Sequence, residues 1–105
     1  MLLGVAYKKN IGDIRESPAF KFLEEFYKNS HIEYHDPYVD KIDVKIKNKL
    51  LKFHSTNISI KKLKKFDIVI LLTDHDKLNY KMIEKHSKIL IDTRGKFSSK
   101  NKNII

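Results

Sequence analysis

The chain has 105 residues, of which 41% are hydrophobic, and its 22 lysines and arginines against 13 acidic residues give a formal net charge of +9. This length holds one small domain with a single core, and the composition excludes a chain that is disordered throughout. The absence of cysteine excludes disulfides, thiolate metal ligands and a cysteine nucleophile within these residues.

The first expected element is a strand at residues 2–7, LLGVAY, because a short and nearly continuous apolar run is typical of a strand covered on both faces. A polar loop follows over residues 8–16. Ser17 and Pro18 then predict a helix start, with serine as the N-cap and proline in the first helical position, where its missing N–H costs little. The apolar stripe of this helix has helical spacing and consists of Ala19, Phe22, Leu23 and Phe26. We expect the helix to end at the following Asn-Ser pair.

The middle of the chain is less regular. A second strand is expected at residues 32–35 and ends at the Asp-Pro pair that follows, since proline cannot donate to a sheet ladder. Residues 39–49 are rich in lysine with isolated Ile and Val, and we expect a loop or a weak helix there. Residues 50–54 indicate a short strand, and residues 57–65 indicate a short helix.

The strongest strand is expected at residues 67–73, DIVILLT, which is apolar and β-branched almost throughout and is therefore predicted to be central and parallel. A short helix is expected at residues 80–86 and a buried strand at residues 88–92. We place one domain at residues 1–95 and a polar tail at residues 96–105. Because no apolar run approaches the roughly 18 residues of a membrane span and no leader peptide is evident, we expect a soluble, cytoplasmic protein with no membrane partner.

This order of strands and helices predicts a three-layer α/β domain with a mainly parallel sheet. Ligands of such sheets bind beyond the carboxyl ends of the strands, where the strand order reverses. The polar residues that come after the expected strands are Lys8, Asp36, Asp74 with His75, and Arg94. We therefore expect a binding crevice at this edge, although the same pattern also arises in any α/β protein whose loops are polar.

Four stretches of the chain are GVAYKKNIGDIRESPA, YHDPYV, DIVILLTDH and LIDTRG. In this order and at these separations they resemble the C-terminal domain of the UDP-glucose/GDP-mannose dehydrogenase family, the nucleotide-sugar 6-dehydrogenases. The resemblance extends from Leu2 to about Arg94, and residues 40–65 match no motif within it. Within the first stretch, Tyr-Lys-Lys and Arg-Glu-Ser-Pro resemble the branch of the family that acts on UDP-N-acetylglucosamine and UDP-N-acetylmannosamine.

The resemblance implies a Rossmann-like fold and, for the full enzyme, NAD-dependent oxidation of a sugar C6 alcohol to a carboxylate in polysaccharide biosynthesis. Members of the family combine an N-terminal NAD-binding domain, a central dimerisation domain and a C-terminal nucleotide-sugar-binding domain. This chain resembles only the last of these, and it has neither a GxGxxG turn nor a cysteine. We therefore expect an excised or truncated chain that binds a UDP-sugar, binds no NAD alone, and is inactive without the other two domains.

The resemblance assigns roles to three basic residues and implies no catalytic residue or metal ligand. Lys8 matches a lysine after the first strand and Arg94 an arginine after the last strand, and both are implied to bind substrate. Arg15 matches an arginine directed at the pyrophosphate of the cofactor. A lysine offers a diphosphate a point charge, and an arginine offers a planar fork for two oxygens. The alternative is that the arginines only pair with neighbouring carboxylates such as Asp13 and Asp92.

A second hypothesis starts from the lysine surplus. A free-standing Rossmann-like binding module with a basic surface could serve a polyanionic partner. However, nucleic-acid readers also use arginines for bidentate contacts and aromatic side chains for stacking. Since the chain has only two arginines, we expect no specific nucleic-acid binding. Asp74 and His75 could both ligate a metal, but the sequence does not fix the position of a third ligand, the resemblance implies no metal, and we assign no metal site.

Overall fold

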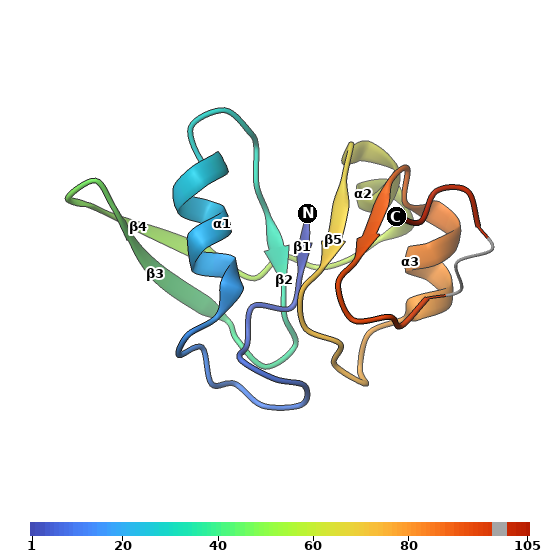
Figure 1. The fold of residues 1–105 in the computed structure, drawn as a ribbon, viewed down its shortest axis with the longest axis horizontal. Helices are drawn as coiled ribbons and strands as arrows, with labels where there is room; N and C mark the ends of the chain where they lie inside the picture. The colour runs from blue at the N-terminus through green and yellow to red at the C-terminus, as the bar shows by residue number, and fades with distance from the viewer. Residues whose placement is uncertain (98–100) are drawn as a thin grey trace.

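Four parallel strands form the centre of the protein (Figure 1), whose computed structural model describes residues 1–97 and 101–105. The strands are β1 (Leu2–Leu3), β2 (Tyr34–His35), β5 (Val69–Leu71) and β6 (Leu90–Asp92). Their order in the sheet is β2-β1-β5-β6, and all three neighbouring pairs are parallel. The predicted parallel sheet is confirmed, with β5 in its interior. The chain leaves β1 toward one edge and β5 toward the other, so the strand order reverses between these two strands.

The sheet separates two apolar layers. Neighbouring residues of a strand point to opposite faces, and in β1 Leu2 packs into one layer and Leu3 into the other. The layer of Leu2 contains the helix α1 (Pro18–Phe26), and the layer of Leu3 contains α2 (Ile60–Lys65) and α3 (Tyr80–His86) (Figure 1). The predicted three-layer α/β architecture is therefore confirmed. Within the described residues, no helix is both long and apolar enough to cross a membrane.

The helix α1 begins where the Ser-Pro pair predicts. The hydroxyl of Ser17 accepts a hydrogen bond from the N–H of Ala19 at 3.2 Å, and Pro18 occupies the first helical position. Ala19 and Leu23 are the buried residues of the helix, which ends at Phe26, about one turn earlier than expected. The N-cap fixes the point at which the polar loop after β1 enters the helix.

The expectation of a loop or weak helix at residues 39–49 is wrong, because this region belongs to a β-hairpin. Its antiparallel strands are β3 (Lys41–Ile46) and β4 (Lys49–His54). Lys47 and Asn48 form the turn with φ values of 48° and 65°, the two left-handed residues that a type I′ turn needs. Apolar residues alternate with charged ones along β3 and pack into the layer of α1: they are Ile42, Val44 and Ile46. The short strand and the short helix expected after this region are present as β4 and α2.

β1 is shorter than the predicted strand because the backbone turns at Gly4. The φ of Gly4 is +81°, and a Cβ there would lie 2.5 Å from the carbonyl oxygen of Thr73 and 2.6 Å from its Cβ. Glycine is therefore required where the ends of β1 and β5 approach each other. The N–H groups of Val5 and Ala6 leave the sheet ladder and bond to the side chain of Asp36 instead.

The end of the chain lies along β6 at one edge of the sheet. The N–H of Leu90 bonds to the carbonyl of Asn103, and the N–H of Ile105 bonds to the carbonyl of Leu90, both at 2.8 Å. The polar tail predicted at residues 96–105 includes residues 98–100, which lie outside the described residues. The last three residues of that tail extend the sheet by main-chain bonds.

The opposite edge of the sheet is extended by the segment that follows the hairpin. Ser55 forms a parallel bridge with Tyr34 of β2, and the N–H of Thr56 bonds to the carbonyl of Tyr34 at 2.8 Å. Nδ1 of His35 lies 2.7 Å from the carbonyl oxygen of Thr56. The hairpin is thereby tied to the edge of the sheet on which β2 lies.

Candidate functional site

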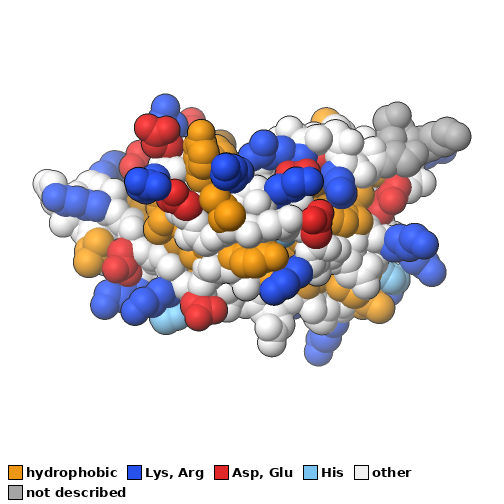
Figure 2. Space-filling model, turned by 90° about the horizontal axis from the view of Figure 1, so that it is seen from below, with side chains coloured by type: hydrophobic (Ala, Val, Ile, Leu, Met, Phe, Trp, Pro, Cys, Tyr) orange, Lys and Arg blue, Asp and Glu red, His pale blue; other side chains and the backbone are white. Residues whose placement is uncertain are grey.

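The loops that follow β1, β2, β5 and β6 lie at one edge of the sheet, where the strands have their carboxyl ends (Figure 1). The reversal of strand order brings the loops after β1 and β5 next to each other at this edge. In open α/β sheets such a point is the usual place for a ligand. Figure 2 views the molecule from this side, and lysine and arginine side chains are spread over the face with apolar side chains between them.

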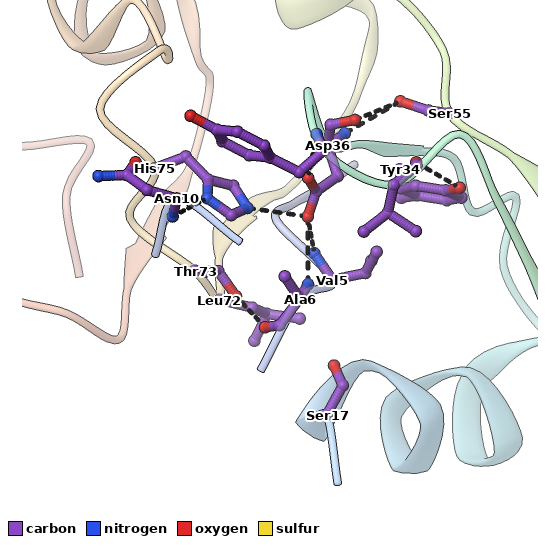
Figure 3. Close-up of polar contacts among 12 residues, drawn as sticks. Val5, Ala6, Asn10, Ser17, Tyr34, Asp36, Ser55, Leu72, Thr73 and His75 are labelled. Carbon is purple, nitrogen blue, oxygen red and sulfur yellow. Dashed lines mark hydrogen bonds and ion pairs between the residues drawn. The ribbon is translucent and has the colours of Figure 1, made fainter. Parts of the chain in front are cut away.

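A buried carboxylate, that of Asp36, joins three of these loops (Figure 3). Its Oδ2 accepts hydrogen bonds from the N–H of Val5 at 2.8 Å and of Ala6 at 3.1 Å, and its Oδ1 accepts one from the N–H of Tyr38 at 2.8 Å. Nε2 of His75 lies 2.9 Å from the same Oδ2. A carboxylate without access to water needs such a set of donors. Asp36 therefore fixes the ends of β1, β2 and β5 relative to one another.

The imidazole of His75 is also fully buried, and both of its nitrogens have partners. Nδ1 accepts a hydrogen bond from the backbone N–H of Asn10 at 2.7 Å, so this nitrogen carries no proton. The proton of the neutral ring must then be on Nε2, which donates it to Asp36. The imidazole thus connects the buried carboxylate to the loop after β1.

Further contacts tie the loop after β1 to the loop after β5. The side-chain amide of Asn10 donates to Asp76 at 2.7 Å and accepts from the N–H of Asp76 at 2.9 Å. This bond from Asn10, followed by the charge of Lys9, lowers the pKa of Asp76. The hydroxyl of Thr73 donates to the carbonyl of Ala6 at 2.6 Å. The two loops therefore act as one unit at the reversal point.

Arg94 lies in the loop after β6, where its side chain is exposed. Its Nε donates to the carbonyl of Leu72 at 2.8 Å, and its backbone N–H donates to the carboxylate of Asp92 at 3.0 Å. Asp92 therefore contacts the main chain of Arg94 and not its guanidinium. No described residue accepts a hydrogen bond from the two Nη groups. The bond to Leu72 orients the guanidinium at the carboxyl edge of the sheet.

Arg15 lies at the other end of the loop after β1 and pairs with Asp13. Its Nε lies 3.0 Å from Oδ1 of Asp13 and its Nη2 lies 2.6 Å from Oδ2, so the contact is bidentate. Hydrogen bonds from Arg15 lower the pKa of Asp13 to about 2, with a small contribution from the charge of Lys8. The side chain of Arg15 is 87% exposed. In this structure Arg15 therefore forms an ion pair with the neighbouring Asp13.

The predicted residues lie in two loops of the carboxyl edge, those after β1 and β6, and β5 separates these two strands in the sheet. Lys8 and Arg15 are exposed in the loop after β1, and Arg94 is exposed in the loop after β6. The contact between Asp36 and His75 was not predicted, because it depends on β2 and β5 flanking β1, and the strand order is not readable from the sequence. Among the described residues, no group of three or more His, Cys, Asp or Glu residues could hold a metal ion.

Comparison with protein families and curated proteins gives consistent matches. A family model described as "UDP-glucose/GDP-mannose dehydrogenase family, UDP binding domain" matches residues 1–99. An NDP-N-acetyl-D-galactosaminuronic acid dehydrogenase from Ralstonia solanacearum is 30% identical over 101 residues, which cover 92% of this chain and 22% of that protein. The chain therefore spans about a fifth of this curated relative.

Solved structures give the same picture of the fold. The structure of a UDP-D-ManNAc dehydrogenase from Pyrococcus horikoshii matches 99% of this chain and 23% of its own length, with a TM-score of 0.68 and 28% identity. A UDP-N-acetyl-mannosamine dehydrogenase from Staphylococcus aureus matches 99% of this chain and 24% of its own, with a TM-score of 0.64 and 22% identity. The second likeness supports the fold alone.

Proposed function

The chain belongs to the UDP-glucose/GDP-mannose dehydrogenase family as its UDP binding domain, and on this premise we propose that its carboxyl edge binds the diphosphate of a UDP-sugar through Lys8 and Arg94. The observation that carries the proposal is the family match over residues 1–99, which includes both residues. The full enzyme that we propose oxidises the C6 alcohol of the sugar to a carboxylate with NAD. The NAD-binding and dimerisation domains are then its partners.

The surroundings of the two substrate-binding residues support this role. A diphosphate offers several anionic oxygens, which an ammonium meets as a point charge and a guanidinium as a planar fork. The Nε of Arg94 donates to the carbonyl of Leu72, and among the described residues the four N–H bonds of its Nη groups have no acceptor, so they are available to a ligand. Lys8 is exposed, and no described carboxylate forms an ion pair with it.

For Arg15 we propose a contact with the pyrophosphate of NAD when the NAD-binding domain lies opposite. Its present partner, Asp13, competes for the same two N–H directions. The pair lies in water, where the attraction between opposite charges is screened. A pyrophosphate with more negative charge than a carboxylate can therefore displace Asp13 from Arg15.

The class of sugar that we propose is an N-acetylated hexosamine. The similar proteins include an NDP-N-acetyl-D-galactosaminuronic acid dehydrogenase and, at 28% identity, a UDP-D-ManNAc dehydrogenase. The Tyr-Lys-Lys and Arg-Glu-Ser-Pro residues of the loop after β1 favour the same N-acetylhexosamine branch of the family. We expect the residues that contact the sugar itself to lie in the NAD-binding and dimerisation domains, opposite the carboxyl edge.

Titration of the chain with UDP, followed by amide NMR shifts in about 0.2 M salt, tests the proposal, because purely electrostatic attraction fades at that salt concentration. We expect saturable shifts in the loops after β1 and β6 with a weak, roughly millimolar Kd. Arg94→Ala should abolish the saturation. Lys52→Ala is the matched control, because it removes one charge from an exposed position on β4. Equal affinities of the Arg94→Ala variant and the wild type would refute the role of Arg94.

A further inference from the structure

We propose that His75 is a positioning residue, which holds the loop carrying Lys8 in its ligand-binding place through a single N–H···N hydrogen bond to Asn10. Its effect on ligand binding rests on the proposed function, whereas its effect on the loop does not. Nδ1 of His75 accepts the bond at 2.7 Å, and the ring itself is fully buried. A buried side chain thus reaches an exposed loop through one atom.

The part of the loop around Asn10 depends on this bond, because few other hydrogen bonds hold residues 7–10. Residues 7–10 are exposed, and the main-chain bond that closes the loop joins the N–H of Tyr7 to the carbonyl of Asp13. Asn10 lies at the far side of the loop with a φ of 64°, a left-handed value that asparagine tolerates better than most residues. Besides its bonds to the exposed Asp76, its N–H bond to His75 links residues 7–10 to the interior, whereas the later part of the loop is held by Ile14, which packs against the core.

The imidazole is a rigid support for the loop. Its Nε2 bonds to the buried carboxylate of Asp36, and its ring lies against the ring of Tyr38 with the centroids 4.8 Å apart. The hydroxyl of Tyr80 donates to the backbone carbonyl of His75 at 2.6 Å. The position of Nδ1 is therefore set by the loop after β2, which carries Tyr38 and Asp36 (Figure 3), and by Tyr80 at the start of α3.

The two nitrogens of the ring have separate tasks. Nε2 serves the fold, because it supplies one of the donors of the buried Asp36. Nδ1 serves the loop, because within residues 1–97 and 101–105 its partner is the N–H of Asn10 alone. Two conservative substitutions separate the tasks. In His75→Asn an amide oxygen can take the place of Nδ1 and accept from Asn10, whereas in His75→Gln an amide nitrogen can take the place of Nε2 and donate to Asp36.

The experiment combines hydrogen exchange of the Asn10 amide with UDP titration for the wild type and both variants. We expect His75→Gln to speed exchange at Asn10 by about fivefold and to weaken UDP binding by a similar factor, as the loss of one hydrogen bond implies. His75→Asn should keep the exchange rate and the UDP affinity near the wild-type values while it lowers the Tm. Equal losses of UDP affinity in both variants would show a merely structural role and overturn the proposal.

A measurement on the wild-type chain tests the same bond without any variant. An N–H···N hydrogen bond transmits a scalar coupling between its two nitrogens, so labelled protein should show one between the Asn10 amide and Nδ1 of His75. A protonated Nδ1 would overturn the proposal. If the wild type binds no UDP, the proposed function fails, and the coupling and the exchange rates still decide whether His75 positions the loop.

Discussion

Substitution of Gly4 by alanine should destabilise the domain more than the same substitution at Gly95, which also has a positive φ. The added Cβ would lie 2.5 Å from the carbonyl oxygen of Thr73 and 2.6 Å from its Cβ, both far inside van der Waals contact. The positive φ of +81° adds a conformational cost, because a Cβ crowds the carbonyl in this region. Main chain and a packed side chain surround the position, so neither cost is easily relieved.

Gly95 provides the matched control for the size of the effect. Its φ is +67°, but a Cβ there would have nothing within 4 Å. Gly95→Ala should therefore cost only the left-handed penalty of about 1 to 2 kcal/mol. Gly4→Ala adds overpacking of about 1 to 3 kcal/mol. The free energies of unfolding of the two variants should thus differ by roughly the overpacking cost.

Urea unfolding followed by circular dichroism measures both variants against the wild type. With a slope of about 2 kcal/mol per molar urea, the midpoint of Gly4→Ala should lie roughly 0.5 to 1.5 M below that of Gly95→Ala. Equal midpoints would refute the steric argument, because they would mean that the ends of β1 and β5 separate freely. The variant also tests the site, since Val5 and Ala6 follow Gly4 and donate to Asp36.

Two further predictions concern charged residues outside the site. A hydrogen bond from Lys62 lowers the pKa of Glu33 from 4.5 to about 2, so this group stabilises the fold above pH 4.5 and the contribution is lost as the pH falls toward 2. Urea unfolding between pH 2 and 6 should show a weaker decline in Glu33→Gln, and an unchanged decline would contradict the assignment. Lys47→Asn should stabilise the hairpin by about 1 kcal/mol, because asparagine tolerates a φ of 48° better than lysine does. The same change should raise the pKa of Lys28, which the hydrogen bond and charge of Lys47 lower; an NMR titration of Lys28 checks this, and an unchanged pKa would contradict it.

Local chemistry made most of the fold predictable. The Ser17-Pro18 pair placed the start of α1, and the apolar run of β5 placed the central strand, because each signal arises within a few residues. The hairpin was missed for a physical reason. Lysine occupies five of the 14 residues of the hairpin, and this charge obscures the alternation in β3 that buries Ile42 and Val44. The turn at Lys47 carries no glycine to mark it.

The sequence predicts a position for the site but not its contacts. The rule that ligands bind at carboxyl edges predicts roles for Lys8 and Arg94, which follow β1 and β6 in the chain. The pairing of Asp36 with His75 needs the knowledge that β2 and β5 both lie beside β1. A sequence separates these residues by 39 positions, and no local pattern links them. Such a contact becomes visible only with the strand order.

The extension of both edges of the sheet also bears on how the chain behaves among its own copies. An exposed edge strand offers unpaired N–H and C=O groups to a second molecule and invites aggregation. Among the described residues, Ser55 and Thr56 occupy this position beside β2, and Asn103 and Ile105 occupy it beside β6. Removal of residues 103–105 would uncover Leu90 in an apolar edge strand, so expression tags and truncations at this end determine whether the domain remains monodisperse.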